Sequence, residues 1–242
     1  MLDYGMAKTV FNKKTVDAAT AQKLGEEVLA LVSGSLPLDL AKLKSLIERG
    51  ANLEVRSENN SHTPLLKAAS RGQEGAVEML LDGGAEKYAK TPTDGASALF
   101  LGIAIANRGV VKQLLDHGVD PDHDTFKGGL SGLMWAANLG KREIVDELVE
   151  HGAKVKREHP IDNKTAADYA EKDHLRNHII KLGERQEREK LETARMIAEQ
   201  KAAAEKMAAV IIAADQGINH HGEIAAPVKA TFRKRLPVAQ LK

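Results

Sequence analysis

The chain has 242 residues, of which 43% are hydrophobic, 29% are charged and only 3% are aromatic. Its 35 lysine and arginine residues nearly cancel its 34 aspartate and glutamate residues, so no global charge points to nucleic acid or a membrane surface. Cysteine is absent, which excludes disulfides, cysteine-based zinc sites and a thiol nucleophile.

Residues 1–16 are polar and show no helical period, so we expect them to form an N-terminal arm. They lack the apolar core of a signal peptide, and no run in the chain approaches the ~18 apolar residues of a membrane span. These features predict a soluble, cytoplasmic protein.

Two helices are predicted next, over residues 17–32 and 38–49, with Gly50 ending the second. The first helix is long and polar. A terminal unit of a repeat array has this character, because its outer side faces water. We therefore expect residues 17–50 to form an N-terminal capping unit.

The stretch from Thr63 to Gly84 predicts a helical hairpin. Thr63-Pro64 suits a helix start, because the threonine hydroxyl can accept an unpaired backbone N–H and proline fits the first helical position. Gly72 interrupts the first helix, and Gly83-Gly84 ends the second, since glycine readily adopts the left-handed conformation found there. A single hairpin of this kind cannot bury its own apolar face.

The hairpin recurs with a period of 34 residues. Polar residues that open first helices and glycines that close second helices both keep this spacing, as do two apolar columns. The openers are Thr63, Ser97, Ser131 and Thr165; the glycines are Gly50, Gly84, Gly118 and Gly152; the columns are Leu46, Leu80, Leu114 and Leu148, and Val77, Val111 and Val145.

These motifs resemble the ankyrin-repeat family, whose consensus is D-G-x-T-P-L-H-x-A-A-x-x-G-H-x-E-I-V-x-x-L-L-x-x-G-A-D. TPLLKAASRGQEGAVEMLLDGGAE and SGLMWAANLGKREIVDELVEHGAK fit it well, and the resemblance covers residues 38–182. It implies an all-α ankyrin-repeat solenoid of about five helix-turn-helix units, within an ankyrin-repeat domain of residues 17–183. The chain departs from the family in its period, which is usually 33, and at four positions: Leu66, Phe100 and Met134 replace histidine, and Ala106 replaces glycine.

Beyond Thr165 the second helix does not stop where the pattern expects it to. Residues 184–215 are rich in strong helix formers and interleaved charges, which predicts a long charged helix ending at Gly217. Leu191, Ile197, Met207 and Ile211 do not hold the a/d seam of a coiled coil, and we expect the more apolar end, residues 207–214, to dock on something. Residues 216–242 are predicted to form a basic, flexible tail.

No enzyme signature is found in the sequence. His174 and His178 have the i, i+4 spacing of a metal clamp but no specified third ligand, and Asp120 to Asp124 lacks the glycine and glutamate of a calcium loop. We expect no catalytic residue, no metal and no cofactor, and we expect Trp135 to pack in the core.

The ankyrin resemblance also implies a partner-binding surface on the concave face, made by the inter-repeat fingers and the residues after Ala-Ala in each first helix. Ile105, Leu130, Leu139 and Ile161 are apolar there, where the fold does not demand it, which suggests a protein-binding patch. Carried onto this chain, the expected partner-binding residues are Asn60, His62, Ser70, Arg71, Thr93, Ala96, Ala104, Ile105, Lys127, Leu130, Asn138, Leu139, Ile161 and Lys164.

The main hypothesis is a non-enzymatic scaffold or adaptor that binds another protein through this face. A narrower version is a bacterial effector, secreted into a host cell to act on host proteins. The alternative is a regulatory or targeting subunit whose C-terminal helix and basic tail engage an anionic membrane, nucleic acid or itself. A further alternative is that the C-terminal segment folds back and covers the apolar patch.

Overall fold

The computed structural model describes residues 15–34, 37–57, 61–123, 125–126 and 129–216. The chain divides into two compact units, residues 1–186 and residues 187–242, and each is described by itself. The N-terminal arm lies almost entirely outside the described residues, as does the basic tail apart from its first residue.

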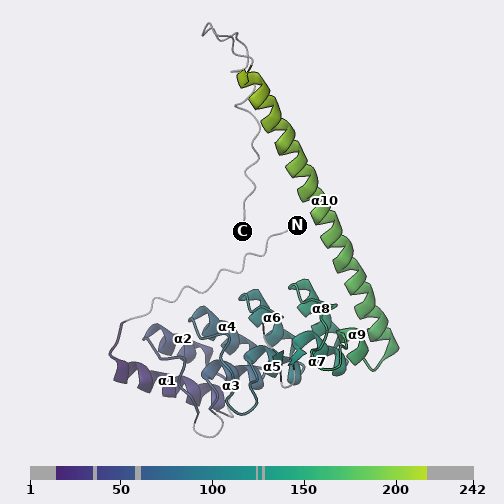
Figure 1. Ribbon diagram of the computed structural model, residues 1–242. Coiled ribbons are helices and arrows are strands. Elements are labelled where there is room, and N and C mark those ends of the chain that lie inside the picture. Colours follow the sequence, from purple (N-terminus) through teal and green to yellow (C-terminus); the bar gives the residue numbers. More distant parts are fainter. Residues whose placement is uncertain (1–14, 35–36, 58–60, 124, 127–128, 217–242) are drawn as a thin grey trace. The chain divides into compact units, whose positions relative to one another are not determined.

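The first unit is a stack of helix pairs (Figure 1). The first helices of successive pairs contact one another in series, and so do the second helices, which gives two layers. This arrangement confirms the predicted all-α repeat solenoid. The pairs are α1 (Ala18–Ser33) with α2 (Leu40–Glu48), α3 (Pro64–Ser70) with α4 (Glu74–Asp82), α5 (Ala98–Ala104) with α6 (Arg108–Asp116), α7 (Gly132–Asn138) with α8 (Arg142–Glu150), and α9 (Ala166–Tyr169) with the start of α10 (Asp173–Gln216).

The predicted helix starts are confirmed by their capping hydrogen bonds. The hydroxyl oxygens of Thr63, Ser97 and Ser131 each accept the backbone N–H three residues ahead, at 3.3, 3.4 and 3.2 Å. Each bond satisfies one of the N–H groups that a helix start leaves without a partner. Thr165 instead donates its N–H and hydroxyl to Asp168, at 2.8 and 2.7 Å.

Left-handed residues end the helices as the glycine spacing predicts. The four glycines after the second helices have φ angles of 90°, 81°, 73° and 93°. The turns inside the second and fourth pairs have the same conformation, supplied by Gly72 at 70° and Gly140 at 68°. Ala106 occupies this position in the third pair at φ 56°, so the departure from the family pattern leaves an alanine in a strained conformation.

The core runs between the two layers and through every pair. The leucine column of the sequence is at most 1% exposed and the valine column is fully buried. Burying each leucine stabilises the stack by roughly 1.5–3 kcal/mol. No hairpin could bury these side chains alone, which is why the pairs stack.

Helix α10 begins as the second helix of the last pair and does not stop. Leu175 and Ile179 lie in the core. Gly183, where the sequence suggests a domain boundary, lies inside the helix, and a Cβ there would come within 3.3 Å of Val155 Cγ1. This glycine therefore allows close packing and does not end the helix. The Gln186 side chain donates to Ala153 O at 2.9 Å and accepts from Val155 N at 3.3 Å.

The second unit contains the rest of α10, residues 187–216. Every side chain from Glu187 to Ala209 is exposed. The Arg195–Glu199 pair at 2.9 Å and the Lys190–Glu187 pair at 3.3 Å lie along its surface. No helix in the described ranges is both long and apolar enough to cross a membrane.

Candidate protein-binding surface

Four loops, here called fingers, connect each second helix to the next first helix; they comprise residues 51–62, 85–96, 119–130 and 153–164. Fingers 1, 2 and 4 are closed by the same backbone hydrogen bond: Ser57 N to His62 O at 3.0 Å, Thr91 N to Ala96 O at 3.0 Å and His159 N to Lys164 O at 2.9 Å. At the corresponding place in finger 3, β1 (Thr125–Phe126) pairs antiparallel with β2 (Leu130–Ser131). The described parts of the four fingers therefore share one repeated pairing at their base.

One residue in each finger turn is left-handed, again with the 34-residue period. These residues are Ser61, Gly95, Gly129 and Asn163, with φ angles of 51°, 70°, 99° and 56°. A search for periodic glycines does not find this position, because serine and asparagine replace glycine in two of the four fingers. Asparagine is one of the few residues with a side chain that adopts this conformation readily.

Neighbouring fingers contact each other. The Arg56 guanidinium of finger 1 donates to Ser61 O at 2.8 Å and to Lys90 O of finger 2 at 3.3 Å. Gly129 of finger 3 faces Pro160 of finger 4 so closely that an added Cβ would lie 2.4 Å from Pro160 Cγ. We call the surface formed by the fingers and the exposed parts of α3, α5 and α7 and of the turns after them the finger face.

The predicted partner-binding residues fall into four groups. Asn60 and Lys127 lie outside the described residues, and Ala96 is buried. His62, Ser70, Leu130 and Leu139 are half-buried. The exposed ones are Arg71, Thr93, Ala104, Ile105, Asn138, Ile161 and Lys164.

Three of these expectations need correction. Ala96 is only 3% exposed, because it lies inside the finger turn, where its N–H donates to Thr91 Oγ1 at 2.8 Å. Leu130 and Leu139 pack against the core. Leu139 ends α7, with its N–H bonded to Trp135 O at 3.0 Å. Both leucines therefore contribute to core packing, whereas the sequence interpretation was that the fold does not need apolar residues at these positions.

Among the side chains of the finger face that the structure describes, Ile105 and Ile161 are the large apolar ones that stay exposed, at 45% and 74%. Ile105 follows α5 and lies beside the preceding hairpin turn: its Cδ1 is 3.4 Å from where a Cβ on Gly72 would be. Ile161 lies in the turn of finger 4. Exposed isoleucine adds nothing to a monomer's core, so both are candidate contacts for a partner.

A polar cluster around Asp162 holds finger 4. Its carboxylate accepts from His159 Nδ1 at 2.8 Å and from the Tyr169 hydroxyl at 3.2 Å, and it pairs with Lys164 Nζ at 3.3 Å. Burial acts to raise the pKa of Asp162, but the hydrogen bond from Lys164 N and those from the side chains outweigh it and lower the pKa to about 2. Asp162, the residue after Ile161, is therefore held in place by several hydrogen bonds.

Finger 1 presents a different chemistry. The pKa of His62 lies below its usual value, first because burial disfavours the charged ring and then because Lys67 repels it, with Asp94 opposing. The ring Nδ1 is buried without a hydrogen-bond partner in the described structure. Of the neighbouring predicted residues, Ser70 donates to Lys67 O at 2.9 Å and Arg71 donates to Gly34 O at 2.8 Å. These two side chains stabilise the stack as well as facing solvent.

The opposite layer of second helices carries a polar network that sequence reasoning missed. Glu147 of α8 is only 2% exposed and binds the Arg108 guanidinium of α6 at 2.9 Å. His151 binds Asp116 at 3.1 Å, and Lys112 binds the same carboxylate at 2.9 Å. Burial acts to raise the pKa of Asp116, but these two bonds outweigh it and the pKa is lowered.

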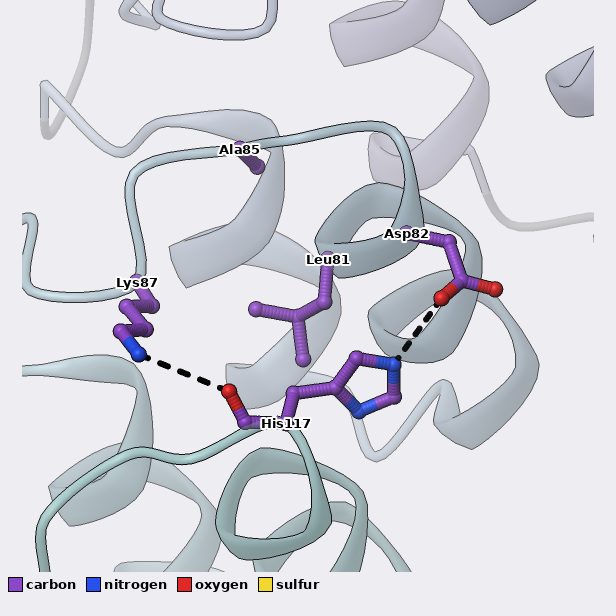
Figure 2. Close-up of a pocket in the computed structure, with 5 residues that line it drawn as sticks. All are labelled: Leu81, Asp82, Ala85, Lys87 and His117. Atoms are coloured by element: carbon purple, nitrogen blue, oxygen red, sulfur yellow. Dashed lines mark hydrogen bonds and ion pairs between the residues drawn. The ribbon is translucent and has the colours of Figure 1, made fainter. Parts of the chain in front are cut away.

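The pair Asp82–His117, at 3.2 Å, is the copy of Asp116–His151 one repeat earlier. It lines a cavity of about 350 Å³ together with Leu81, Ala85 and Lys87 (Figure 2). Figure 2 shows the imidazole directed at the Asp82 carboxylate and the Lys87 ammonium directed at the backbone of His117. Lys87 Nζ also donates to Gly118 O at 2.8 Å. These polar groups bind each other across two repeats. The cavity therefore lies at a contact between neighbouring repeats.

Of the two histidines with clamp spacing, His178 is bonded to Asp146. Within the described ranges, no group of three or more histidine, aspartate or glutamate residues is placed to hold a metal ion.

Comparison with known families agrees with the geometry. The family model "Ankyrin repeats (3 copies)" matches residues 32–125 and 101–182, which together span more than half of the chain. The chain belongs to the ankyrin-repeat family, whose repeats are a protein–protein interaction module. A search of curated proteins finds no match.

Proposed function

We propose that this protein is a scaffold or adaptor that binds a partner protein through the finger face, with Ile105 and Ile161 as its apolar anchors. The observation that carries the proposal is their exposure, 45% and 74%, on a surface where Leu130 and Leu139 pack against the core. Buried apolar anchors surrounded by polar contacts dominate the energy of most protein interfaces.

The rigidity of the fingers supports this assignment. Finger 4 is closed by its backbone hydrogen bond, by the Asp162 cluster and by the contact of Pro160 with finger 3. A surface already held in one conformation loses little conformational entropy when it binds, which favours affinity. Lys164 and Asn138, both exposed, supply polar contacts around the anchors.

The test begins by identifying a partner, through a pull-down with the full chain and mass spectrometry. The affinity of that partner is then measured for Ile105→Asp and Ile161→Asp. We expect each change to weaken binding by about 2 kcal/mol, roughly thirtyfold in Kd, because a charge replaces a buried apolar contact.

Ile180→Asp is the matched control. Ile180 is also an isoleucine exposed at 45%, but it lies on α10, outside the finger face. Leu139→Asp is unsuitable, because Leu139 packs against the core. If binding survives both finger-face changes, or falls equally in Ile180→Asp, the assignment of the surface is wrong.

The proposal covers partner binding alone. The role of a bacterial effector acting on host proteins rests only on the resemblance to other ankyrin-bearing proteins. The expected absence of enzyme activity likewise remains a prediction.

A further inference from the structure

The exposed part of α10 has one face without charge. From Leu191 to Gln216 the helix carries seven charged residues, and none falls on a stripe that recurs every three and four residues. The stripe consists of Thr193, Met196, Ile197, Gln200, Ala203, Ala204, Met207, Val210, Ile211 and Ala214. All of its members but two are apolar, so the stripe divides the helix surface into an apolar side and a charged side.

In heptad notation the stripe fills the a, d and g positions. Ile197, Ala204 and Ile211 fall at a; Thr193, Gln200, Met207 and Ala214 fall at d. Leu191 falls at b. An a/d seam that includes Leu191 is therefore irregular, whereas one without it is not. The stripe covers about three heptads, the shortest run over which such a pattern indicates a coiled coil.

Side chains of this stripe from Thr193 to Met207 are exposed in the single chain. Met196, Ile197 and Met207 are 56%, 61% and 63% exposed. The ion pair Arg195–Glu199 connects f and c positions, on the opposite side of the helix. A soluble helix with its charges confined to one side and large apolar residues exposed on the other presents a surface for another helix.

We infer that residues 191–216 form a parallel, in-register two-stranded coiled coil with a second copy of this chain. The stripe offers a partner no charge to recognise, which disfavours a strongly acidic or basic partner. The seven charged residues elsewhere on this segment of the helix are four acidic and three basic, so two copies do not repel strongly. In a symmetric dimer the stripe of one chain packs against the same stripe of the other, so the two apolar surfaces have equal length.

Gln200 selects both the partner and the orientation. A glutamine side chain is both donor and acceptor, so two copies at facing d positions can hydrogen-bond each other. Antiparallel pairing sets d against a, which would place Gln200 opposite an apolar residue such as Ile211 and leave its amide without a partner. A single polar residue at a core position fixes register in this way at some cost in stability.

The first test measures the mass of the full chain in solution by light scattering or sedimentation. Wild type is expected at twice the mass of one chain. The double variant Ile197→Glu with Met207→Glu should be monomeric, with the dissociation constant raised at least about a hundredfold, because like charges then face each other. Both side chains are exposed in the single chain, so the helical circular dichroism of the monomer should persist.

Leu191→Glu is the matched control. Leu191 is 72% exposed on the same helix but lies off the stripe, so this variant should remain dimeric. A monomeric wild type overturns the proposal, whether its stripe is free, binds vesicles or packs elsewhere on the same chain. Dissociation of Leu191→Glu to the same extent as the double variant also overturns it.

A second test uses the absence of cysteine from the chain. In a parallel in-register pair, Gln200→Cys brings two thiols within the distance that a disulfide requires, whereas Leu191→Cys does not. Mild oxidation should therefore cross-link the first variant into a covalent dimer and leave the second one single. Equal cross-linking of both, or none of Gln200→Cys, would contradict parallel pairing.

Discussion

The helix-pair stack and the exposed part of α10 are both helical but differ in what stabilises them. In the stack, Leu148 is fully buried between layers, whereas Leu191 on α10 is 72% exposed. The short helices of the stack would not persist alone, and they form because neighbouring pairs bury their apolar sides. The helix beyond Gln186 depends instead on helix propensity and on pairs such as Arg195–Glu199.

The largest expected effect comes from removing a core leucine. Leu148→Ala should lower the free energy of unfolding of the stack by about 2–5 kcal/mol, because it leaves a cavity between layers. Leu191→Ala should change the same quantity by less than about 0.5 kcal/mol. Urea denaturation followed by circular dichroism compares the two. Similar losses for both would remove the distinction between the two regions.

A smaller effect is expected at the left-handed alanine. Ala106→Gly should stabilise the stack by about 1 kcal/mol, because glycine adopts a φ of 56° without strain. Gly140→Ala reverses the change at the equivalent position, where no atom lies within 4 Å of the added Cβ. It should therefore destabilise the stack by a similar amount in the same denaturation experiment. A loss of stability in Ala106→Gly would show that the strain is absent.

Breaking a surface ion pair on α10 should matter less. Arg195→Ala removes the pair with Glu199, and the local helix should lose about 0.3–0.5 kcal/mol, because exposed pairs at this spacing contribute little. Amide hydrogen exchange around residue 195 would detect the change, which should shrink in high salt. No effect is expected on exchange in the stack.

The most local effect is the titration of finger 4. The pKa of Asp162 in the folded chain is about 2, below its ordinary 3.8, so its contribution to stability is fully present above pH 3.8 and is lost as the pH falls to about 2. NMR resonances of the Asp162 carboxyl carbon and the Ile161 methyl groups should titrate together in this window. Asp162→Asn should abolish that titration and loosen Ile161, while the other fingers keep their spectra.

The repeat architecture could be predicted because its rules are local. Thr63, Ser97 and Ser131 cap helices and the periodic glycines end them, at the positions that the 34-residue period predicts. Packing could not be predicted in the same way. Ala96, Leu130 and Leu139 occupy family positions that face outward, and only the local geometry of the turn and of the α7 end shows that they are buried or half-buried.

The contacts between repeats are visible in the sequence as polar residues that recur with the 34-residue period, a pattern that the glycines alone do not show. Asp82 and Asp116 are 34 residues apart, as are His117 and His151, and each histidine binds the aspartate of the preceding repeat. A search for every polar residue that recurs at the period would have found these pairs. The pair Asp146–His178 is not a further copy, because Asp146 lies 34 residues after Lys112 and not after Asp116.

The series of contacts from each first helix to the next, and from each second helix to the next, makes the stack an open-ended array whose length is adjustable by whole units. Removing residues 97–130 would place Ser131 directly after Ala96, so that one serine cap replaces another and the following repeat keeps its phase. Such a deletion would also bring Ile161 one finger closer to the capping unit. The deletion would also remove Ile105, so the quantity that changes in whole repeats, without a new fold, is the distance between the anchor Ile161 and the capping unit.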